Sequence, residues 1–177
     1  MSDDMKETIA EAAKYLIFKK QVRKLTVKDI VNECQITRQT FYYHFEDIPG
    51  LFRWILKQDE KQMLHAVSSM DSTEKILKYF FQLAIRMTPD VHRGMQTNYR
   101  AELQQLIYEY CYCFLEAGLQ KTSYYTTHSQ ADIRLFLRYH SYAILGFLQS
   151  WSTDDTEHID EIIHQIYLLI KTEIEKN

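Results

Sequence analysis

Glycine and proline are scarce in this sequence, with 4 and 2 among 177 residues. Turn-rich β architectures need more of both, so the composition favours long helices. Long apolar runs are missing as well, because no stretch approaches the roughly 18 residues that a membrane span requires. The N-terminus is acidic and amphipathic and lacks the charge-then-apolar order of a signal peptide. We therefore expect an all-α protein of the cytoplasm with no membrane partner.

Cysteine is also sparse, and its placement argues against disulfides and metal sites. Cys34, Cys111 and Cys113 form an odd set without a disulfide framework. The last two lie two positions apart on an expected helix, so they point about 200° apart and cannot close on one metal ion. The histidines are scattered, and no nucleophile elbow, phosphate-binding loop or HExxH pattern occurs. The sequence thus predicts no metal, no cofactor and no enzyme activity.

Apolar residues recur at helical spacing along most of the chain, which predicts a succession of helices. Thr26 and Thr37 are typical helix N-caps, the first with an acid three positions later, and Asp47 opens a further helix. Pro89 is expected to end a helix, and residues 121–130 to form the longest loop. The expected helices span residues 4–19, 26–34, 37–45, 47–68, 73–88, 98–120, 130–151 and 157–175.

The helix order and the charge distribution divide the chain into two regions, residues 1–47 and 48–177. The whole chain carries a net charge of −3, which argues against a general polyanion binder, yet residues 14–44 carry +5. A basic segment on an acidic body suggests that only one end of the molecule approaches a phosphate backbone.

The expected helix at residues 37–45 has two contrasting faces. At 100° per residue, Phe41 and Phe45 share one face and, with Ile36, would anchor the helix to its neighbours. The opposite surface carries side chains that suit a DNA major groove. Arginine and glutamine can form bidentate bonds to guanine and adenine, threonine can contact a thymine methyl, and tyrosine and histidine suit phosphate oxygens. This surface consists of Arg38, Gln39, Thr40, Tyr42, Tyr43 and His44.

This stretch resembles the DNA-binding signature of TetR-family transcriptional regulators. The matching residues are Thr26-Val27-x-Asp29-Ile30, then Ile36-Thr37-Arg38-x-Thr40-Phe41-Tyr42-Tyr43-His44-Phe45, then Leu51. The resemblance implies an N-terminal three-helix helix-turn-helix domain, residues 1–47, followed by a helical-bundle effector and dimerisation domain, residues 48–177. It also implies a homodimer on a near-palindromic double-stranded operator, a repressor being the usual role. The implied DNA contacts are Thr26, Lys28, Thr37, Arg38, Gln39, Thr40, Tyr42, Tyr43 and His44.

The chain departs from the family pattern at two positions. Where the family usually has Ala-Gly in the turn, this chain has Cys34-Gln35, so a residue with a Cβ must take a left-handed conformation. Where the family often has lysine after the His-Phe pair, this chain has Ile48, which removes one phosphate contact. The run at residues 41–48 also resembles the subgroup of dihydroxyacetone-kinase operon regulators.

The last two expected helices carry the evidence for a dimer. Each has an apolar stripe that widens in places, so more than one face requires burial. A four-helix contact between two protomers would bury both stripes, and a large intramolecular core is the alternative. The expected interface residues are Phe136, His140, Ile144, Phe147, Trp151, Ile162, Ile166, Leu169 and Ile170.

The sequence says less about what regulates the protein. Aromatic and apolar residues with a few polar groups would suit a small-molecule effector, although such stripes at helical spacing are more often core. The candidates are Trp54, Arg86, Met87, Tyr99, Arg100, Tyr108, Cys111, Tyr112 and His140. A body that docks a protein co-regulator, with no small ligand, is the alternative.

Overall fold

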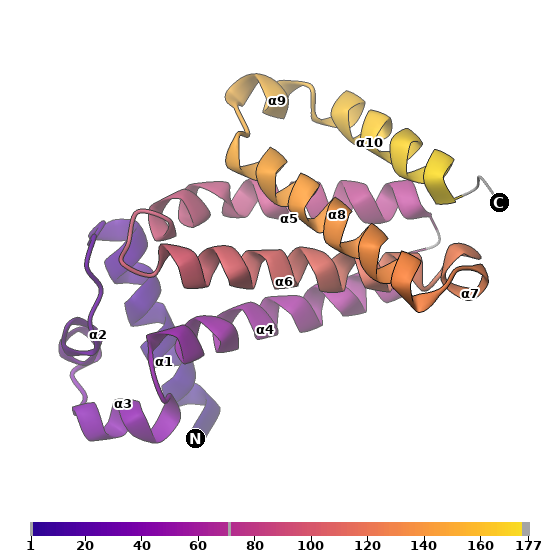
Figure 1. Cartoon of the computed structure of the whole chain (residues 1–177). Helices are drawn as coiled ribbons and strands as arrows, with labels where there is room; N and C mark the ends of the chain where they lie inside the picture. The colour runs from indigo at the N-terminus through magenta and orange to yellow at the C-terminus, as the bar shows by residue number, and fades with distance from the viewer. Residues whose placement is uncertain (1, 71, 175–177) are drawn as a thin grey trace. The chain divides into compact units, whose positions relative to one another are not determined.

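The computed structural model describes residues 2–70 and 72–174, and side chains within 4–70, 72–85 and 92–174. All regular structure in these ranges is helical, as predicted (Figure 1). The chain packs as two compact units, Met1–Asp59 with Pro89–Leu106, and Glu60–Thr88 with Ile107–Asn177. The boundary therefore falls inside three helices: α4 (Ile48–Ser68), α5 (Thr73–Gly94) and α6 (Arg100–Leu119).

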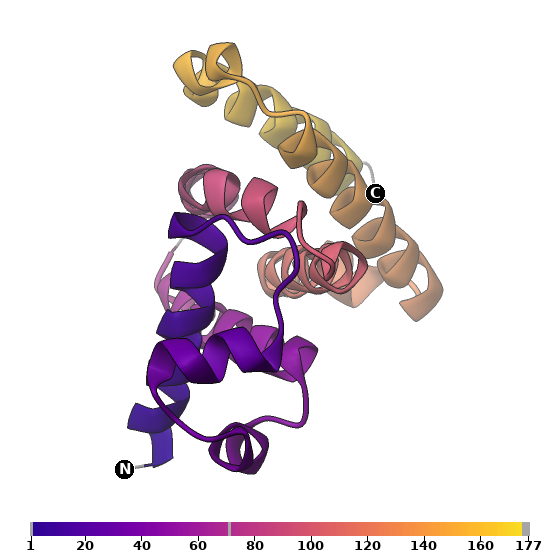
Figure 2. The same cartoon turned by 90° about the vertical axis from the view of Figure 1, so that its left-hand side faces the viewer.

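The first unit contains the basic N-terminal segment. Helix α1 (Ser2–Lys14) continues into a π-helical turn, η1 (Tyr15–Lys19), and is followed by α2 (Val27–Cys34) and α3 (Arg38–His44). Figures 1 and 2 each show one of α2 and α3 along its axis and the other from the side, so the two helices cross steeply. This is the predicted arrangement of two short helices around a tight turn. Their core consists of Ile9, Ala13, Leu25, Ile30, Phe41 and Leu51 with their buried neighbours.

Side-chain caps fix where these helices begin. Thr26 and Asp29 form the predicted capping box, in which the Asp29 N–H donates to Thr26 Oγ1 and the Thr26 N–H donates to Asp29 Oδ2. Thr37 Oγ1 accepts from the Thr40 N–H, and Asp47 Oδ1 accepts from the Gly50 N–H. The turn after α2 places Gln35 at φ 56°, ψ 40°. The left-handed conformation expected of a residue with a Cβ is thus confirmed.

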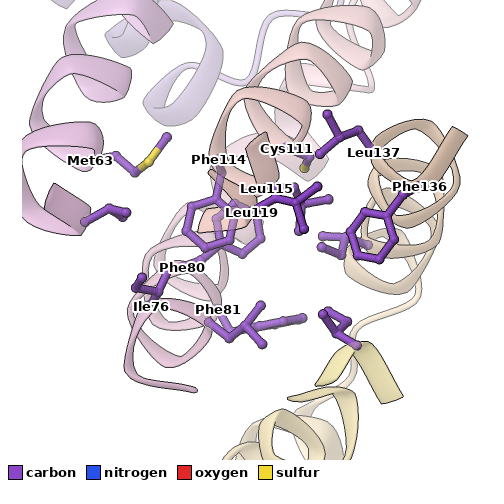
Figure 3. Packing of buried hydrophobic residues seen from close by; sticks show 14 of the residues in the cluster. Met63, Ile76, Phe80, Phe81, Cys111, Phe114, Leu115, Leu119, Phe136 and Leu137 are labelled. Atoms are coloured by element: carbon purple, nitrogen blue, oxygen red, sulfur yellow. The ribbon is translucent and has the colours of Figure 1, made fainter. Parts of the chain in front are cut away.

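The second unit is a larger helical core. Phe80 of α5 stacks on Phe114 of α6, with ring centroids 4.1 Å apart, and Phe136 and Leu137 of α8 (Gln130–Gln149) close the core from another side (Figure 3). A short α9 (Thr153–Glu157) connects α8 to α10 (Ile159–Ile174), which runs antiparallel to α8 (Figure 1). No helix in the described parts of the chain combines the length and apolar character that crossing a membrane takes.

Three predicted boundaries differ from the structure. Helix α5 does not end before Pro89 but continues to Gly94. A proline removes one backbone hydrogen bond, and here the far end of the helix is held independently, because Arg93 Nη1 donates to the Phe18 carbonyl. The expected loop at 121–130 contains α7 (Tyr124–Thr127), since the buried Tyr124 ring stacks on His128 at 3.7 Å. The expected helix at 157–175 begins at Ile159, and the short α9 that precedes it was not predicted.

Candidate nucleic-acid interface

Helix α3 is anchored to the first unit by one face. Phe41 is fully buried and Phe45, at the C-cap of the helix, is nearly so. Their ring centroids lie 6.0 Å apart, and Phe45 lies 6.0 Å from the ring of Trp54 on α4. Ile36 is half-buried against the same core. The anchoring face predicted from the spacing is therefore the one that packs.

The opposite face of α3 is open to solvent. The Tyr43 side chain is 83% exposed and that of Tyr42 is 56% exposed. Arg38 and Gln39 are also exposed, whereas His44 is half-buried with its ring 5.0 Å from that of Tyr43. Neighbouring exposed aromatic side chains are typical of interaction surfaces. This face offers a cation, an amide and two phenols from one short helix.

The threonines near this surface have structural partners of their own. Thr26 Oγ1 donates to Asp29 Oδ2 over 2.6 Å while it accepts from the Asp29 N–H. The hydroxyls of Thr37 and Thr40 lie 2.9 Å apart. Because these hydroxyls already cap helices or bond to one another, they have less capacity left for a ligand than the exposed ends of Arg38 and Gln39. Hydrogen-bond capacity is therefore concentrated at the start of α3.

Basic side chains extend the surface along the segment that precedes α2. Lys19, Lys20, Arg23 and Lys24 are exposed, as is Lys28 on the first turn of α2. Lys20 Nζ is 2.8 Å from Glu33 Oε2, and this hydrogen bond raises the pKa of the lysine. The exposed cations of this segment form a run of positive charge suited to phosphates, although the charge of Lys20 is paired with Glu33.

The N-terminus of α4 differs from this pattern. Ile48 is 2% exposed and belongs to the hydrophobic core. The Asp47 carboxylate caps the helix and lies 3.7 Å from Arg53 Nη2. The Asp47 carboxylate thus occupies the N-terminal end of α4, where free N–H groups could otherwise bind a phosphate.

Residues 9–54, which contain these elements, match a family model described as "Bacterial regulatory proteins, tetR family". The match shows that residues 9–54 are of the TetR-family type. A solved structure titled "Dihydroxyacetone kinase operon activator DhaS" is also similar, with a TM-score of 0.62 and 19% sequence identity over 96% of each chain. At this identity the likeness shows a common fold. No curated protein matched the chain.

The effector candidates are divided between the two units. Trp54, Tyr99 and Arg100 belong to the first unit, where the Tyr99 ring packs 5.7 Å from Phe52. The others described are in the second unit, where Cys111 is part of the core. Burial raises the pKa of the Cys111 thiol to about 12. Tyr108 lies 6.3 Å from Tyr112, and His140 bonds to Glu173. The side chains of Arg86 and Met87 lie outside the described residues.

The described second unit does contain a small apolar pocket. Its volume is about 30 Å³, room for a group about the size of one or two water molecules. It lies among α5, α6, α8 and α10, and its lining includes Phe114, Phe136 and Ile170. None of the sequence-based effector candidates lines it. Prediction missed this pocket because its apolar lining gives the same helical pattern as an ordinary core.

Most of the expected dimer residues pack in or against the core of their own protomer. Phe136, Ile144, Trp151 and Ile170 are buried in the core of the second unit. Phe147, Ile162, Ile166 and His140 are half-buried, and only Leu169, at 71%, is largely exposed. The intramolecular core that the sequence left as an alternative accounts for these stripes. The exposed apolar residues on the same two helices are Leu135, Tyr139, Tyr142, Leu168 and Leu169.

Proposed function

We propose that this DNA-binding transcriptional regulator reads a near-palindromic operator with α3 as a homodimer, and that an effector releases or repositions it. The single observation that carries the DNA-reading part is the contrast between the two faces of α3. Phe41 is fully buried, whereas Tyr43 on the same short helix is 83% exposed. A helix held rigidly by one face can present the other to base edges in a fixed orientation.

Each exposed side chain has a role that its chemistry supports. Arg38 and Gln39 would form bidentate bonds to bases, and Thr40 and Tyr43 would contact base edges or methyl groups. Tyr42 and His44 would bind phosphate oxygens and set the register. Lys28, on the first turn of α2, would contact the phosphate backbone of the DNA. Thr26 and Thr37, also proposed contacts, would reach phosphates only while sharing hydroxyls that cap helices.

A homodimer would use the exposed stripe of α8. Leu135, Tyr139, Tyr142 and Gly146 recur at positions i, i+4, i+7 and i+11, which places them along one side of the helix. All four are exposed, and the space beside the Gly146 Cα is open, so a second helix could approach closely there. Leu168 and Leu169 would extend this surface onto α10. The two α3 helices would then lie about 34 Å apart to enter successive major grooves.

The effector of this dimer would act by a population shift between two conformations. A ligand or partner that favours a different spacing of the two α3 helices would weaken DNA binding by its differential affinity for the two states. The pocket of about 30 Å³ is far smaller than a typical ligand site of about 300 Å³ or more. A small-molecule effector that bound in this pocket would therefore have to open the surrounding core. A protein co-regulator that docks on the outside is the second candidate.

The test of DNA reading is the affinity of Tyr43→Ala for a duplex selected by the wild-type protein from a random pool. We expect a loss of about 1–3 kcal/mol in binding free energy. Because Tyr43 is exposed, the free energy of unfolding should stay within about 0.5 kcal/mol of wild type. Gln104→Ala, at an exposed position of α6 outside both proposed surfaces, is the control and should bind as wild type. Wild-type affinity in Tyr43→Ala would contradict the assignment.

A further inference from the structure

The segment that leads into α2 is held by a residue 73 positions later in the chain. The Leu25 N–H donates to Asn98 Oδ1 over 2.9 Å, and Asn98 Nδ2 is 3.5 Å from the Leu25 carbonyl. The Asn98 N–H also donates to the Arg23 carbonyl over 3.0 Å. Asn98 thus bonds to both sides of one residue and to the carbonyl of a second, much as a neighbouring β-strand would.

A second contact secures the other end of the same segment. Arg93 Nη1 donates to the Phe18 carbonyl over 2.7 Å. Phe18 lies in the π-helical turn η1, and Gln21 shortly after it takes a positive φ of 53°. A chain that leaves a helix through such a conformation needs external partners for its backbone groups. Arg93 and Asn98 together supply them at both ends of residues 18–25.

The loop that carries these two residues has a defined shape of its own. The buried Thr97 donates its hydroxyl proton to the Gly94 carbonyl over 2.7 Å and accepts from the Tyr99 N–H over 3.2 Å. A Cβ on Gly94 would lie 2.9 Å from Leu103 Cδ1, so the end of α5 packs closely on the start of α6. The loop therefore offers a firm support for the segment it holds.

We propose that Asn98 and Arg93 are positioning residues for DNA binding, an inference that rests on the proposed function. They fix residues 18–25, which carry the exposed Lys19, Arg23 and Lys24. Leu25 comes directly before Thr26, the cap of α2. Holding this peptide places both the basic segment and the first turn of α2, with Lys28, relative to the phosphate backbone. Cations that are held in place lose less conformational entropy on binding than cations on a loose segment.

This assignment also indicates how regulation could reach the DNA-binding helices. The loop at residues 95–99 joins α5 to α6, and both helices continue into the second unit. A partner that shifts either helix would move the support of the basic segment. Regulation would then act on the phosphate contacts made by the first unit as well as on the spacing of the two α3 helices.

The experiment compares Asn98→Ala with Gln96→Ala, which removes an exposed amide from the same loop. Binding to the duplex selected by the wild-type protein is measured between about 50 and 200 mM salt. We expect Asn98→Ala to bind about tenfold more weakly at the lower salt, with a salt slope smaller by about one. Gln96→Ala should behave as wild type. A loss of folded protein would lower the active fraction but would not change the slope.

A second measurement tests the hydrogen bond of Asn98 to Leu25 independently of DNA binding. Hydrogen exchange of the Leu25 amide should be faster in Asn98→Ala than in Gln96→Ala, because its acceptor is gone. If Asn98→Ala does not fold, the DNA affinity and salt slope of Arg93→Met are measured instead. This variant keeps the apolar stem of Arg93. Unchanged affinity and slope, or weaker binding with an unchanged slope, would overturn the positioning role. A wild-type protein that selects no duplex would instead refute the proposed function itself.

Discussion

Asp59 on α4 is a partly buried acid whose environment disfavours its charge. Loss of solvation raises the pKa of its carboxyl, and the Lys14 ammonium only partly offsets this. A raised pKa means that the folded state holds its proton to higher pH than the unfolded chain does. Stability therefore falls as pH rises through the window between the ordinary value of about 3.9 and the folded value.

Asp59→Asn should accordingly unfold at a higher denaturant concentration than wild type at pH 7. The difference should shrink as the pH is lowered toward about 3, where both states of the wild-type protein are protonated. Urea titrations at several pH values measure it, with Glu46→Gln, at an exposed site, as the control for removing a charge. An asparagine variant that is less stable at pH 7 would contradict this assignment.

The burial and conformation of some residues on and near α3 could be predicted from the sequence, whereas those of others could not. Phe41 and Tyr43 were assigned to opposite faces by the helical period alone, and their exposures agree. The left-handed Gln35 followed from the need for a tight turn. The burial of Ile48 was not anticipated, because its identity only indicated a missing cation. Nor could the role of Asn98 be read, since a hydrogen bond between residues 73 positions apart leaves no local pattern.

At the scale of elements, the capping box of α2 is the interaction most open to a direct test. The Thr26 hydroxyl accepts from the Asp29 N–H and donates to the Asp29 carboxylate. Thr26→Ala removes both bonds and should lower the free energy of unfolding by about 0.5–2 kcal/mol. Thr26→Ser keeps the hydroxyl and should restore most of the loss. Chemical denaturation measures both, and equal stability of the two variants would show that the cap contributes nothing.

Helix existence was predictable here, but helix ends were less so. Threonine and aspartate caps mark α2, α3 and α4 because their side chains act on the nearest backbone groups. The continuation of α5 past Pro89 depends on the hydrogen bond from Arg93 to the carbonyl of Phe18, a distant residue in the sequence. The short α7 depends on burial of Tyr124. Local propensity cannot report such tertiary contacts.

At the scale of the whole molecule, the apolar residues of α8 and α10 include both buried and exposed positions, which the sequence could not separate. Both faces of α8 carry apolar residues, and the periodicity does not say which face lies inward. The structure assigns Phe136 and Ile144 to the protomer core and leaves Leu135 and Tyr139 exposed. Likewise, the predicted division after residue 47 follows the helix order, whereas the packing assigns residues 48–59 and 89–106 to the first unit as well.

The proposed dimer surface gives a prediction for assembly. Leu135→Glu places a charge in the middle of an interface that would exclude water, so dimerisation should weaken by about 2 kcal/mol or more. Light scattering across protein concentration measures the shift, with Gln120→Glu, at an exposed site on the second unit, as the control. Since Leu135 is 66% exposed in the protomer, its folding should be unaffected. An unchanged dimer would place the interface elsewhere.

The central claim is that the exposed face of α3 reads DNA sequence, and base preference tests it most directly. Duplexes are selected from a random pool by the wild-type protein and by Gln39→Ala, with Gln104→Ala, at an exposed position of α6, as the control. We predict that wild type and Gln104→Ala recover the same near-palindromic sequence. Gln39→Ala should lose preference at one base pair in each half-site, by about 1–3 kcal/mol. Recovery of an identical sequence by Gln39→Ala, with undiminished preference at every position, would contradict the account.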